Sequence, residues 1–176
     1  IVNDVVGDVP VSVTFCPLCN SAIVFDRRLD GVVYDFGTSG KLRQSDLIMW
    51  DRQTESWWQQ FTGEAIVGEL TGKKLTFISA SIISWEDFKA AKPEGKVLSK
   101  NTGFSRDYGR NPYPGYDTAS DRPFLFRGEI NSLLEPTARV VALSVGGVDV
   151  AYPFAFLRSV SVVNDSVGGV PVVALW

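Results

Sequence analysis

The most informative absence in this 176-residue chain is histidine, which does not occur at all. Histidine is the commonest general base and a frequent metal ligand, so these residues lack the usual activator of a catalytic serine or cysteine. Methionine occurs once and cysteine twice. Two cysteines are too few for a disulfide-stapled scaffold, and they constrain the redox compartment only weakly.

Clustered positive charge and long apolar runs are also lacking. The net charge is −3, and no run of Lys or Arg exceeds two residues. Nucleic-acid binding needs clustered positive charge, so we expect no nucleic-acid partner. No uncharged apolar stretch reaches the roughly 18–20 residues that span a bilayer, so we expect no transmembrane segment. The length predicts a single domain over 1–176, or two pseudo-repeated lobes. Because the chain opens on Ile1 and not on methionine, we expect that an N-terminal portion of the full protein is missing.

The pattern of the chain is short β-branched and apolar runs between turns. The segments 9–15 and 22–25 read as strands, and Asp30-Gly31 is a hairpin signal. In "SWEDFKAAKP", Ser84 and Asp87 predict a capped helix of about two turns. The stretch 101–123, rich in Gly, Pro and Tyr, predicts a long loop. We therefore expect a mainly β fold, barrel-like or sandwich-like, with one short helix and long loops.

A repeat links the two ends of the chain. "VNDVVGDVPVSV" (2–13) returns as "VNDSVGGVPVVA" (163–174), with eight identities in the first eleven positions. Because Asn, Asp, Gly and Pro all keep their register, chance in a Val-rich sequence is a poor explanation. The repeat predicts a duplicated unit, an Asn-Asp turn leading into a Val-rich strand, with the two copies in equivalent places of one sheet or barrel. Only the first copy continues into the cysteines.

"TFCPLCN" holds both cysteines, Cys16 and Cys19. The residues that follow lack helical spacing, which argues against a thioredoxin-like helix start. A zinc ribbon needs a second Cys or His pair, and the chain has none. Copper(I) accepts two or three soft ligands, so Cys16, Cys19 and the single methionine, Met49, are candidate ligands. A redox-active thiol pair and a buried pair without chemistry both remain open.

Polar residues and tryptophans mix in the segment 39–65. Arg43, Asp51 and Gln60 are candidate site residues, with Trp58 lining a Trp-walled pocket that binds a ligand. For Asp51 a structural role, bonding turn amides, is favoured, whereas for Arg43 and Gln60 both roles stay open. Tyr108, in the long loop, is a second candidate for ligand binding, and we expect the loop to pack Tyr108, Tyr113 and Tyr116 towards the mouth of the pocket. We expect the sulfurs to lie next to a concavity that contains one of these polar or aromatic residues or Met49.

Three stretches, "VTFCPLCNSAIVFDRRLDG", "FGTSGKLRQSDLIMWDRQTESWWQQFTGEAIVG" and "ISWEDFKAAKPEGKVLSK", resemble a prokaryotic family known by its CPLC motif and catalogued as a domain of unknown function. The resemblance covers nearly the whole chain. It implies an exported or lipid-anchored protein, with a His-Glu pair often preceding the "VND" segment. It also implies a set of signature positions: Cys16, Pro17, Cys19, Asn20, Gly40, Leu42, Arg43, Ser45, Asp46, Asp51, Thr54, Ser56, Trp58 and Gln60.

Three functions follow from these residues. The first is a thiol-redox or copper(I)-binding protein in which Arg43 or Asp51 tunes the charge on the thiolates, with a small molecule or a protein thiol as partner. The second is a non-enzymatic module that binds a small ligand or peptide in the Trp-walled pocket, with structural cysteines. The third function, a covalent cysteine hydrolase, is the least favoured, because no histidine is present to activate the thiol.

Overall fold

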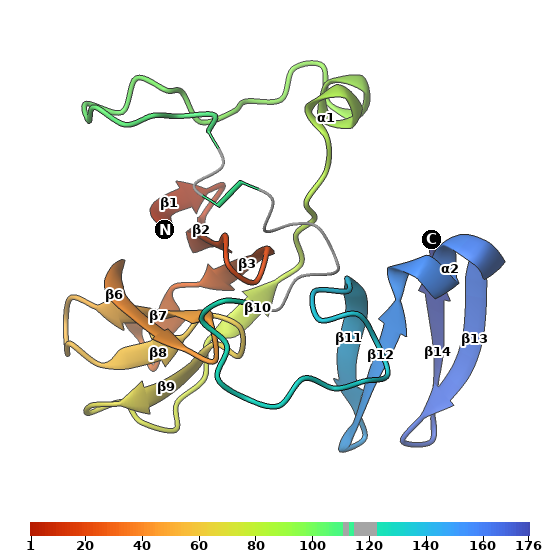
Figure 1. Cartoon of the computed structure of the whole chain (residues 1–176). Helices are drawn as coiled ribbons and strands as arrows, with labels where there is room; N and C mark the ends of the chain where they lie inside the picture. The colour runs from red at the N-terminus through yellow and green to blue at the C-terminus, as the bar shows by residue number, and fades with distance from the viewer. Residues whose placement is uncertain (111–112, 115–122) are drawn as a thin grey trace. The chain divides into compact units, whose positions relative to one another are not determined.

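The computed structural model describes residues 1–110, 113–114 and 123–176, which fall into two compact units (Figure 1). Unit 1 comprises Ile1–Pro114 and unit 2 comprises Gly115–Trp176. The fold is mainly β, as expected, with 43% of residues in strands and 8% in helices. Within these described residues the strands form several small sheets and no closed barrel, and there are two helices where the sequence predicted one.

Unit 1 contains two four-stranded antiparallel sheets. The first has the order β1-β2-β3-β10, and the second has the order β6-β7-β8-β9. The strands of the first sheet are β1 (Val2–Val6), β2 (Val9–Cys16), β3 (Ser21–Asp26) and β10 (Thr76–Ile78). Those of the second are β6 (Phe36–Arg43), β7 (Asp46–Asp51), β8 (Trp57–Gln59) and β9 (Glu64–Val67).

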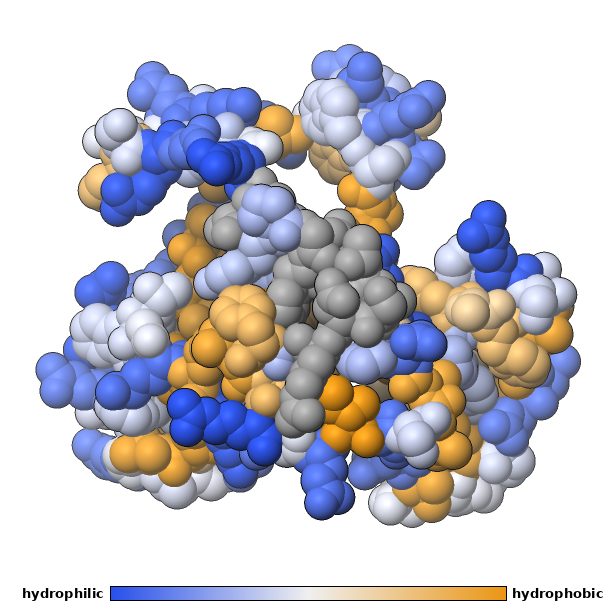
Figure 2. Space-filling view, viewed as in Figure 1, coloured by the Kyte–Doolittle hydropathy of each residue, from blue (hydrophilic) through white to orange (hydrophobic). Residues whose placement is uncertain are grey.

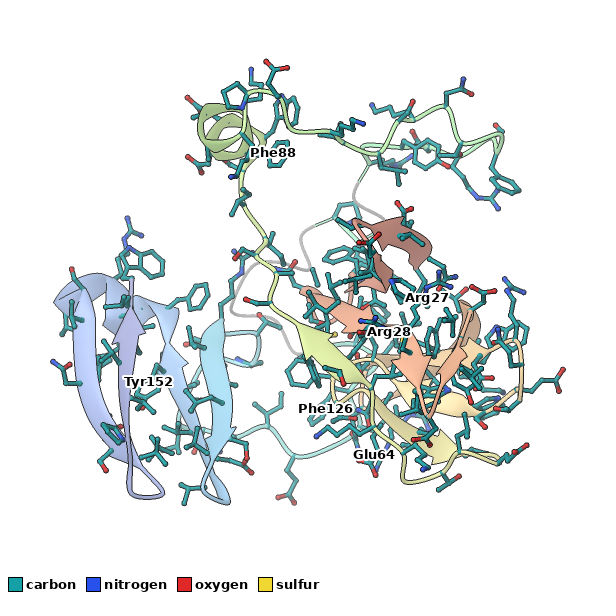
Figure 3. The ribbon with its side chains drawn as sticks, turned by 180° about the vertical axis from the view of Figure 1, so that it is seen from behind. Arg27, Arg28, Glu64, Phe88, Phe126 and Tyr152 are labelled. Atoms are coloured by element: carbon teal, nitrogen blue, oxygen red, sulfur yellow. The ribbon has the colours of Figure 1, made fainter. Side chains whose placement is uncertain are left out.

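A tight hairpin connects the two sheets along the chain. It pairs β4 (Arg28–Leu29) with β5 (Val32–Val33) across the predicted Asp30-Gly31 turn. Both turn residues have positive φ, +50° and +81°, as a type I′ turn requires. At its base Arg28 forms an ion pair with Asp26 (Figure 3). The turn was correctly predicted, but the paired strands are only two residues long.

The core of unit 1 lies around the aromatic residues of both sheets. Trp58 of β8 is fully buried and meets Phe36 of β6 edge to face, with ring centroids 5.7 Å apart. Met49 of β7 is fully buried in the same cluster, alongside Phe25 of β3. The two sheets are therefore held together by side chains from β3, β6, β7 and β8.

The first helix, α1 (Trp85–Ala91), begins where the capping motif predicts. Ser84 Oγ accepts the Asp87 backbone N–H at 3.0 Å, and the hydroxyl donates in turn to the Asp87 carboxylate at 2.6 Å. The rings of Trp85 and Phe88 stack on each other with their centroids 5.7 Å apart. No residue of α1 is buried.

Unit 2 consists of two hairpins joined by the second helix. The strands are β11 (Val140–Val145), β12 (Val148–Pro153), β13 (Val162–Val167) and β14 (Val170–Leu175), with α2 (Phe154–Val160) between β12 and β13. Leu157 of α2 is fully buried against Tyr152 of β12 and Ala174 of β14. The Tyr152 hydroxyl donates to the Asp165 carboxylate of β13 at 2.9 Å (Figure 3).

The strands predicted from the repeat are confirmed, because both copies form hairpins, β1–β2 and β13–β14, each with a two-residue turn. The predicted turn residues were wrong, since the Asn-Asp pairs lie within β1 and β13 and the turns are formed by Gly7-Asp8 and Gly168-Gly169. The two hairpins also belong to different sheets and not to one. The structure adds a third hairpin of the same kind, β11–β12, with the same "SVGGV" sequence at its turn as β13–β14. The turns of β11–β12 and β13–β14 touch, because a Cβ on Gly168 would lie 2.6 Å from the Val145 carbonyl oxygen. Neither helix in the described residues is long and apolar enough to cross a membrane.

Candidate thiol and metal site

The two cysteines flank a tight turn between neighbouring strands. Cys16 ends β2, and Cys19 lies two residues before β3, whose first residue Ser21 pairs with Cys16. Asn20 closes the turn with φ of +48°, a left-handed conformation that asparagine tolerates well. Both thiols are free; Cys16 is buried, and Cys19 is at the surface. The pairing of β2 with β3 therefore holds the turn in place from both sides.

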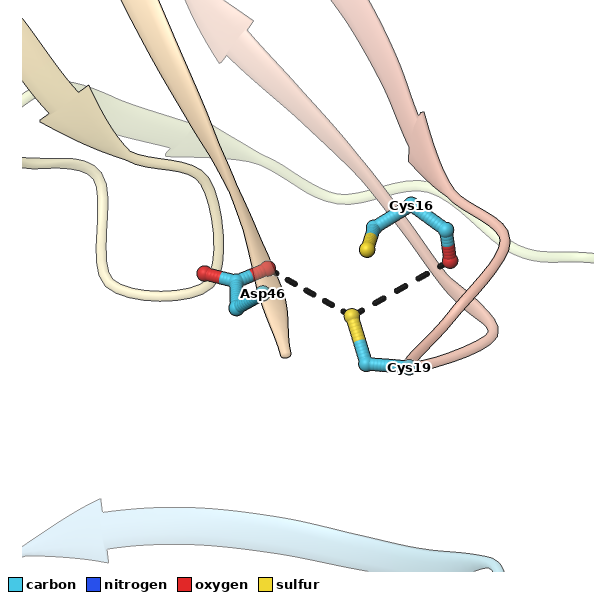
Figure 4. Close-up of side chains that lie close together, drawn as sticks. All are labelled: Cys16, Cys19 and Asp46. Carbon is cyan, nitrogen blue, oxygen red and sulfur yellow. Dashed lines mark hydrogen bonds between the residues drawn. The ribbon is translucent and has the colours of Figure 1, made fainter. Parts of the chain in front are cut away.

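A carboxylate completes the group of side chains at this turn. Ligand atoms of Cys16, Cys19 and Asp46 all lie within 4.8 Å of one another (Figure 4). Asp46 is the first residue of β7, and its Oδ1 lies 3.4 Å from Cys19 Sγ. Its Oδ2 accepts the Phe61 backbone N–H at 2.9 Å, which fixes the carboxylate with one oxygen directed at the sulfur. The site thus joins both sheets of unit 1.

The two thiols differ in acidity. The thiol of Cys19 and the backbone N–H groups of Cys19, Leu47 and Leu18 lower the pKa of Cys16 from its usual 9.0 to about 6, against the opposing effect of burial. The pKa of Cys19 is raised, first by its hydrogen bond to Cys16 and then by burial, with a smaller contribution from Asp46. At neutral pH the pair therefore holds one proton between its two sulfurs.

A chain of hydrogen bonds leads from Cys19 into the core. Ser21 Oγ lies 3.0 Å from Cys19 Sγ and 3.0 Å from Gln60 Oε1. Gln60, fully buried, donates through Nε2 to Thr14 Oγ1 at 3.0 Å and to the Ser21 carbonyl at 3.3 Å. Since both hydrogens of the amide point to these acceptors, its oxygen must accept the Ser21 proton. Ser21 therefore presents lone pairs, and not its proton, to Cys19 Sγ.

Three of the predicted site residues lie in the core and not at the turn. Asp51 is fully buried and accepts hydrogen bonds from the Thr54 backbone N–H at 2.6 Å and from Trp58 Nε1 at 2.9 Å. This is the structural role that the sequence favoured. Trp58 and Met49 belong to the aromatic core. The third chemical group beside the two sulfurs is the carboxylate of Asp46.

Arg43 and Tyr108 have partners of their own. The Arg43 guanidinium donates to Gln59 Oε1 at 3.0 Å in an exposed position. The Tyr108 hydroxyl pairs with Thr102 Oγ1 at 2.5 Å. The described residues of the loop, 101–110, 113–114 and 123, form no helix or strand, as predicted. Tyr116, a third tyrosine predicted near the pocket, lies outside the described residues.

A half-open pocket of roughly 270 Å³ lies next to the turn. Its lining consists of Phe15, Cys16, Pro17, Leu18, Thr38, Gly40, Lys41, Leu42, Leu47 and Tyr113. Its described lining includes no tryptophan and none of Arg43, Met49, Asp51 and Gln60, so this pocket differs in composition from the concavity that the sequence predicted. The Trp-walled pocket is not formed around Trp58, because this side chain is fully buried. Of the three tyrosines predicted at the pocket mouth, Tyr113 lines this pocket and Tyr108 does not.

Comparison with known proteins bears on this site. A family model described as "Protein of unknown function (DUF3179)" matches residues 1–176. The chain belongs to the DUF3179 family. No curated protein and no solved structure matches the chain. The DUF3179 match covers both units, so the hairpin–helix–hairpin of unit 2 is part of the family's domain, as is the CPLC turn.

Asp46 is the site residue that reasoning from the sequence missed. The family resemblance implied Asp46 as a signature position, but the sequence pattern favoured Asp51 as the acidic candidate because Asp51 lies among the tryptophans. Asp46 comes within reach of Cys19 only because the second sheet packs against the first, across 27 residues of chain. The signal that would have found it is its position at the start of an apolar strand, directly after Ser45, where a buried carboxylate needs a partner.

Proposed function

We propose that the CPLC turn of this DUF3179 protein is a thiol site that binds copper(I) through Cys16 and Cys19. The observation that carries this proposal is the proximity of both sulfurs to each other and to one carboxylate, within 4.8 Å. Copper(I) is a soft ion that accepts two thiolates, and a thiolate is the form that binds metal. Backbone N–H groups directed at Cys16 stabilise its thiolate before any ion arrives.

Asp46 affects how the site distinguishes copper(I) from zinc. Metal binding requires that Cys19 also lose its proton, and the Asp46 carboxylate lies 3.4 Å from that thiol. A carboxylate oxygen is a hard ligand, so copper(I) uses the two sulfurs and leaves Asp46 as a neighbouring hydrogen-bond acceptor. Zinc, by contrast, would use all three side chains and keep one position for water. The contribution of Asp46 to affinity therefore distinguishes the two ions.

The test is a competition for copper(I) against a chromophoric chelator under anaerobic, reducing conditions, with zinc measured in parallel. We expect one copper(I) per chain, loss of this binding in Cys16→Ser/Cys19→Ser, and a change of less than about threefold in Asp46→Asn, because two thiolates satisfy the ion. Zinc affinity should fall by at least about tenfold in Asp46→Asn. Asp8→Asn, at an exposed turn residue, serves as the matched control. Copper(I) binding that survives in the double serine variant would refute the proposal.

The unequal acidity of the thiols favours one further function, reversible dithiol oxidation. The Cys16 thiolate attacks a disulfide, forming a mixed disulfide and releasing one thiolate. Cys19 then gives up its proton and attacks Cys16 Sγ, releasing the second thiol and leaving a Cys16–Cys19 disulfide. Since Cys16 is only 1% exposed and lines the pocket, the geometry favours a small disulfide as partner over a protein. Equilibration with glutathione buffers, followed by alkylation and mass analysis, measures this couple; failure to form an intramolecular disulfide in any buffer would exclude it.

The non-enzymatic alternative, a binding module with structural cysteines, has one observation in its favour, the pocket beside Cys16. It differs from the copper proposal in what the double serine variant should do. If the cysteines only brace the fold, Cys16→Ser/Cys19→Ser unfolds at lower urea concentration and binds the same ligands. If they are a metal site, the variant stays folded and loses copper(I).

A further inference from the structure

The pocket at the CPLC turn is built from two parts. Phe15, Cys16, Pro17 and Leu18 come from the end of β2 and the turn itself, and most of the remainder come from β6 and the start of β7. Cys16 and Leu18 are buried, whereas Phe15 and Leu42 are 49% and 41% exposed. The cysteine turn therefore forms the inner wall, and two half-exposed apolar side chains form the rim. Apolar side chains reach the surface in several other places as well (Figure 2).

The lining indicates what kind of molecule fits. Most of its side chains are aliphatic or aromatic, and Thr38 and Lys41 are the main polar exceptions. The Lys41 ammonium lies 5.3 Å from the ring centroid of Trp57, which does not line the pocket, so its charge is already engaged elsewhere. Among the described residues that line the cavity, Lys41 is the one charged side chain, which disfavours a highly charged ligand. An apolar ligand gains by burying its surface against Phe15, Leu18 and Leu42.

The volume of the pocket limits the size of the ligand that it can hold. Sites for drug-sized molecules occupy about 300–1,000 Å³, and this pocket of roughly 270 Å³ lies just below that range. It suits a molecule with a single ring or a short alkyl chain. Cys16 belongs both to the pocket wall and to the group with Cys19 and Asp46, so a ligand in the pocket sits beside one of the two cysteines of that group. A soft ion held by two thiolates accepts a third soft ligand.

We propose that this pocket binds a small, mainly apolar molecule bearing a thiol or thioether, whose sulfur supplies the third ligand at the Cys16–Cys19 site. The apolar half of the proposal rests on the pocket alone. The sulfur half rests on the copper(I) site proposed above. By reciprocity, a ligand that binds more tightly to the copper-loaded chain also tightens copper(I) binding by the same factor.

Two probes that differ in one atom separate these halves. Benzyl mercaptan carries the ring and the sulfur, and benzyl alcohol carries the ring with oxygen in its place. Binding is followed by amide chemical shifts at Phe15, Leu18 and Leu42 under anaerobic, reducing conditions. We expect both probes to bind the metal-free chain with similar, millimolar affinity. On the copper(I)-loaded chain benzyl mercaptan should bind at least about tenfold more tightly, while benzyl alcohol is unchanged.

Substitutions locate the binding. Leu42→Asp places a charge on the rim and should weaken both probes by at least tenfold on the metal-free chain, with copper(I) affinity unchanged. Leu133→Asp, at a leucine that is 85% exposed in unit 2, is the matched control and should change neither. A polar thiol, 2-mercaptoethanesulfonate, should gain less from the pocket than benzyl mercaptan.

The outcomes separate failure of the pocket from failure of the copper site. If neither probe shifts the pocket amides of the metal-free chain, the pocket proposal is overturned and the copper proposal is untouched. If both probes bind but copper(I) brings no gain for the mercaptan, the ligand sulfur does not reach the ion. If the chain takes up no copper(I), the sulfur half fails with the proposed function, and the metal-free titration alone decides the apolar half.

Discussion

The amide oxygen of Gln60 accepts the hydroxyl proton of Ser21 at 3.0 Å, and this one contact determines what Ser21 offers to Cys19. The donors of the amide are held by Thr14 and the Ser21 carbonyl, so the amide cannot turn over without losing two hydrogen bonds. A fully buried glutamine thereby sets the direction of a hydrogen-bond chain that ends at a surface thiol.

Replacing Gln60 tests this chain. Gln60→Leu removes three buried hydrogen bonds and should lower the free energy of unfolding by about 1–3 kcal/mol. It also frees the Ser21 hydroxyl to donate to Cys19, so the pKa of Cys19 should fall and its alkylation at pH 8 should accelerate. Gln59→Leu, which loses only an exposed contact with Arg43, should cost less than about 0.5 kcal/mol and leave alkylation unchanged. Equal alkylation rates in both variants would show that Gln60 acts on stability alone.

Asp51 should matter to stability and not to the thiols. Asp51→Ala leaves the Trp58 indole N–H and the Thr54 backbone N–H without their buried acceptor, which we expect to cost about 3–5 kcal/mol in urea unfolding. Under conditions where the variant remains folded, copper(I) affinity should equal that of the unmodified chain. Loss of copper(I) from the folded variant would place Asp51 back at the site and contradict its assignment to the core.

The thiol pair should give stability a bell-shaped dependence on pH. Between about pH 6 and pH 9 the folded pair holds one proton and the unfolded pair holds two, so stability rises with pH. Above pH 9.0, the usual pKa of each thiol, the unfolded chain releases a proton that Cys19 retains when folded, so stability falls. The quantity to measure is the difference in unfolding free energy between the unmodified chain and Cys16→Ser/Cys19→Ser. A difference that stays flat from pH 6 to pH 10 would rule out the unequal acidity.

The repeated hairpins provide a pair of matched glycines. Gly7 and Gly168 occupy equivalent turn positions with φ of +60° and +56°. A Cβ on Gly7 meets nothing within 4 Å, whereas one on Gly168 would lie 2.6 Å from a carbonyl oxygen. Gly7→Ala should cost about 1–2 kcal/mol from backbone strain, and Gly168→Ala about 1–3 kcal/mol more from the collision. Urea unfolding followed at amide signals of each unit measures both; equal costs would mean that the turns of unit 2 do not touch in solution.

Local signals in the sequence predicted local structure well. The Asp30-Gly31 turn, the Ser84 cap and the terminal hairpins all depend on residues within about a dozen positions of each other. The second helix was missed because α2 has no side-chain cap at Pro153 and follows a β-branched run. It is stabilised by Leu157 packing between two hairpins, which is a tertiary effect. The third hairpin was missed although its "SVGGV" turn is printed twice in the sequence.

In the candidate site, too, the local feature was predicted from the sequence and the features that depend on tertiary packing were not. The approach of the two cysteines follows from a four-residue turn, and the sequence predicted it. The approach of Asp46 depends on how two sheets pack, and the pocket depends on β6 lying beside the turn. Neither can be derived from spacing along the chain. The burial of Trp58 and Met49 was equally out of reach, because strand alternation shows which residues share a face but not which face is covered.

The position of Asp46 on a different sheet from the cysteines has a consequence for how long the chain survives a protease. In the described part of the chain, side-chain packing, hydrogen bonds and the connecting chain hold the sheet of β2 and β3 against the sheet of β7. An ion bound by Asp46 and both sulfurs would cross-link the two sheets. The sheets could then separate only after the ion is released. In the proposed site, copper(I) would bind only the two sulfurs of one sheet, whereas zinc would bind side chains of both sheets. Occupancy by zinc would then slow opening and digestion, and occupancy by copper(I) would not.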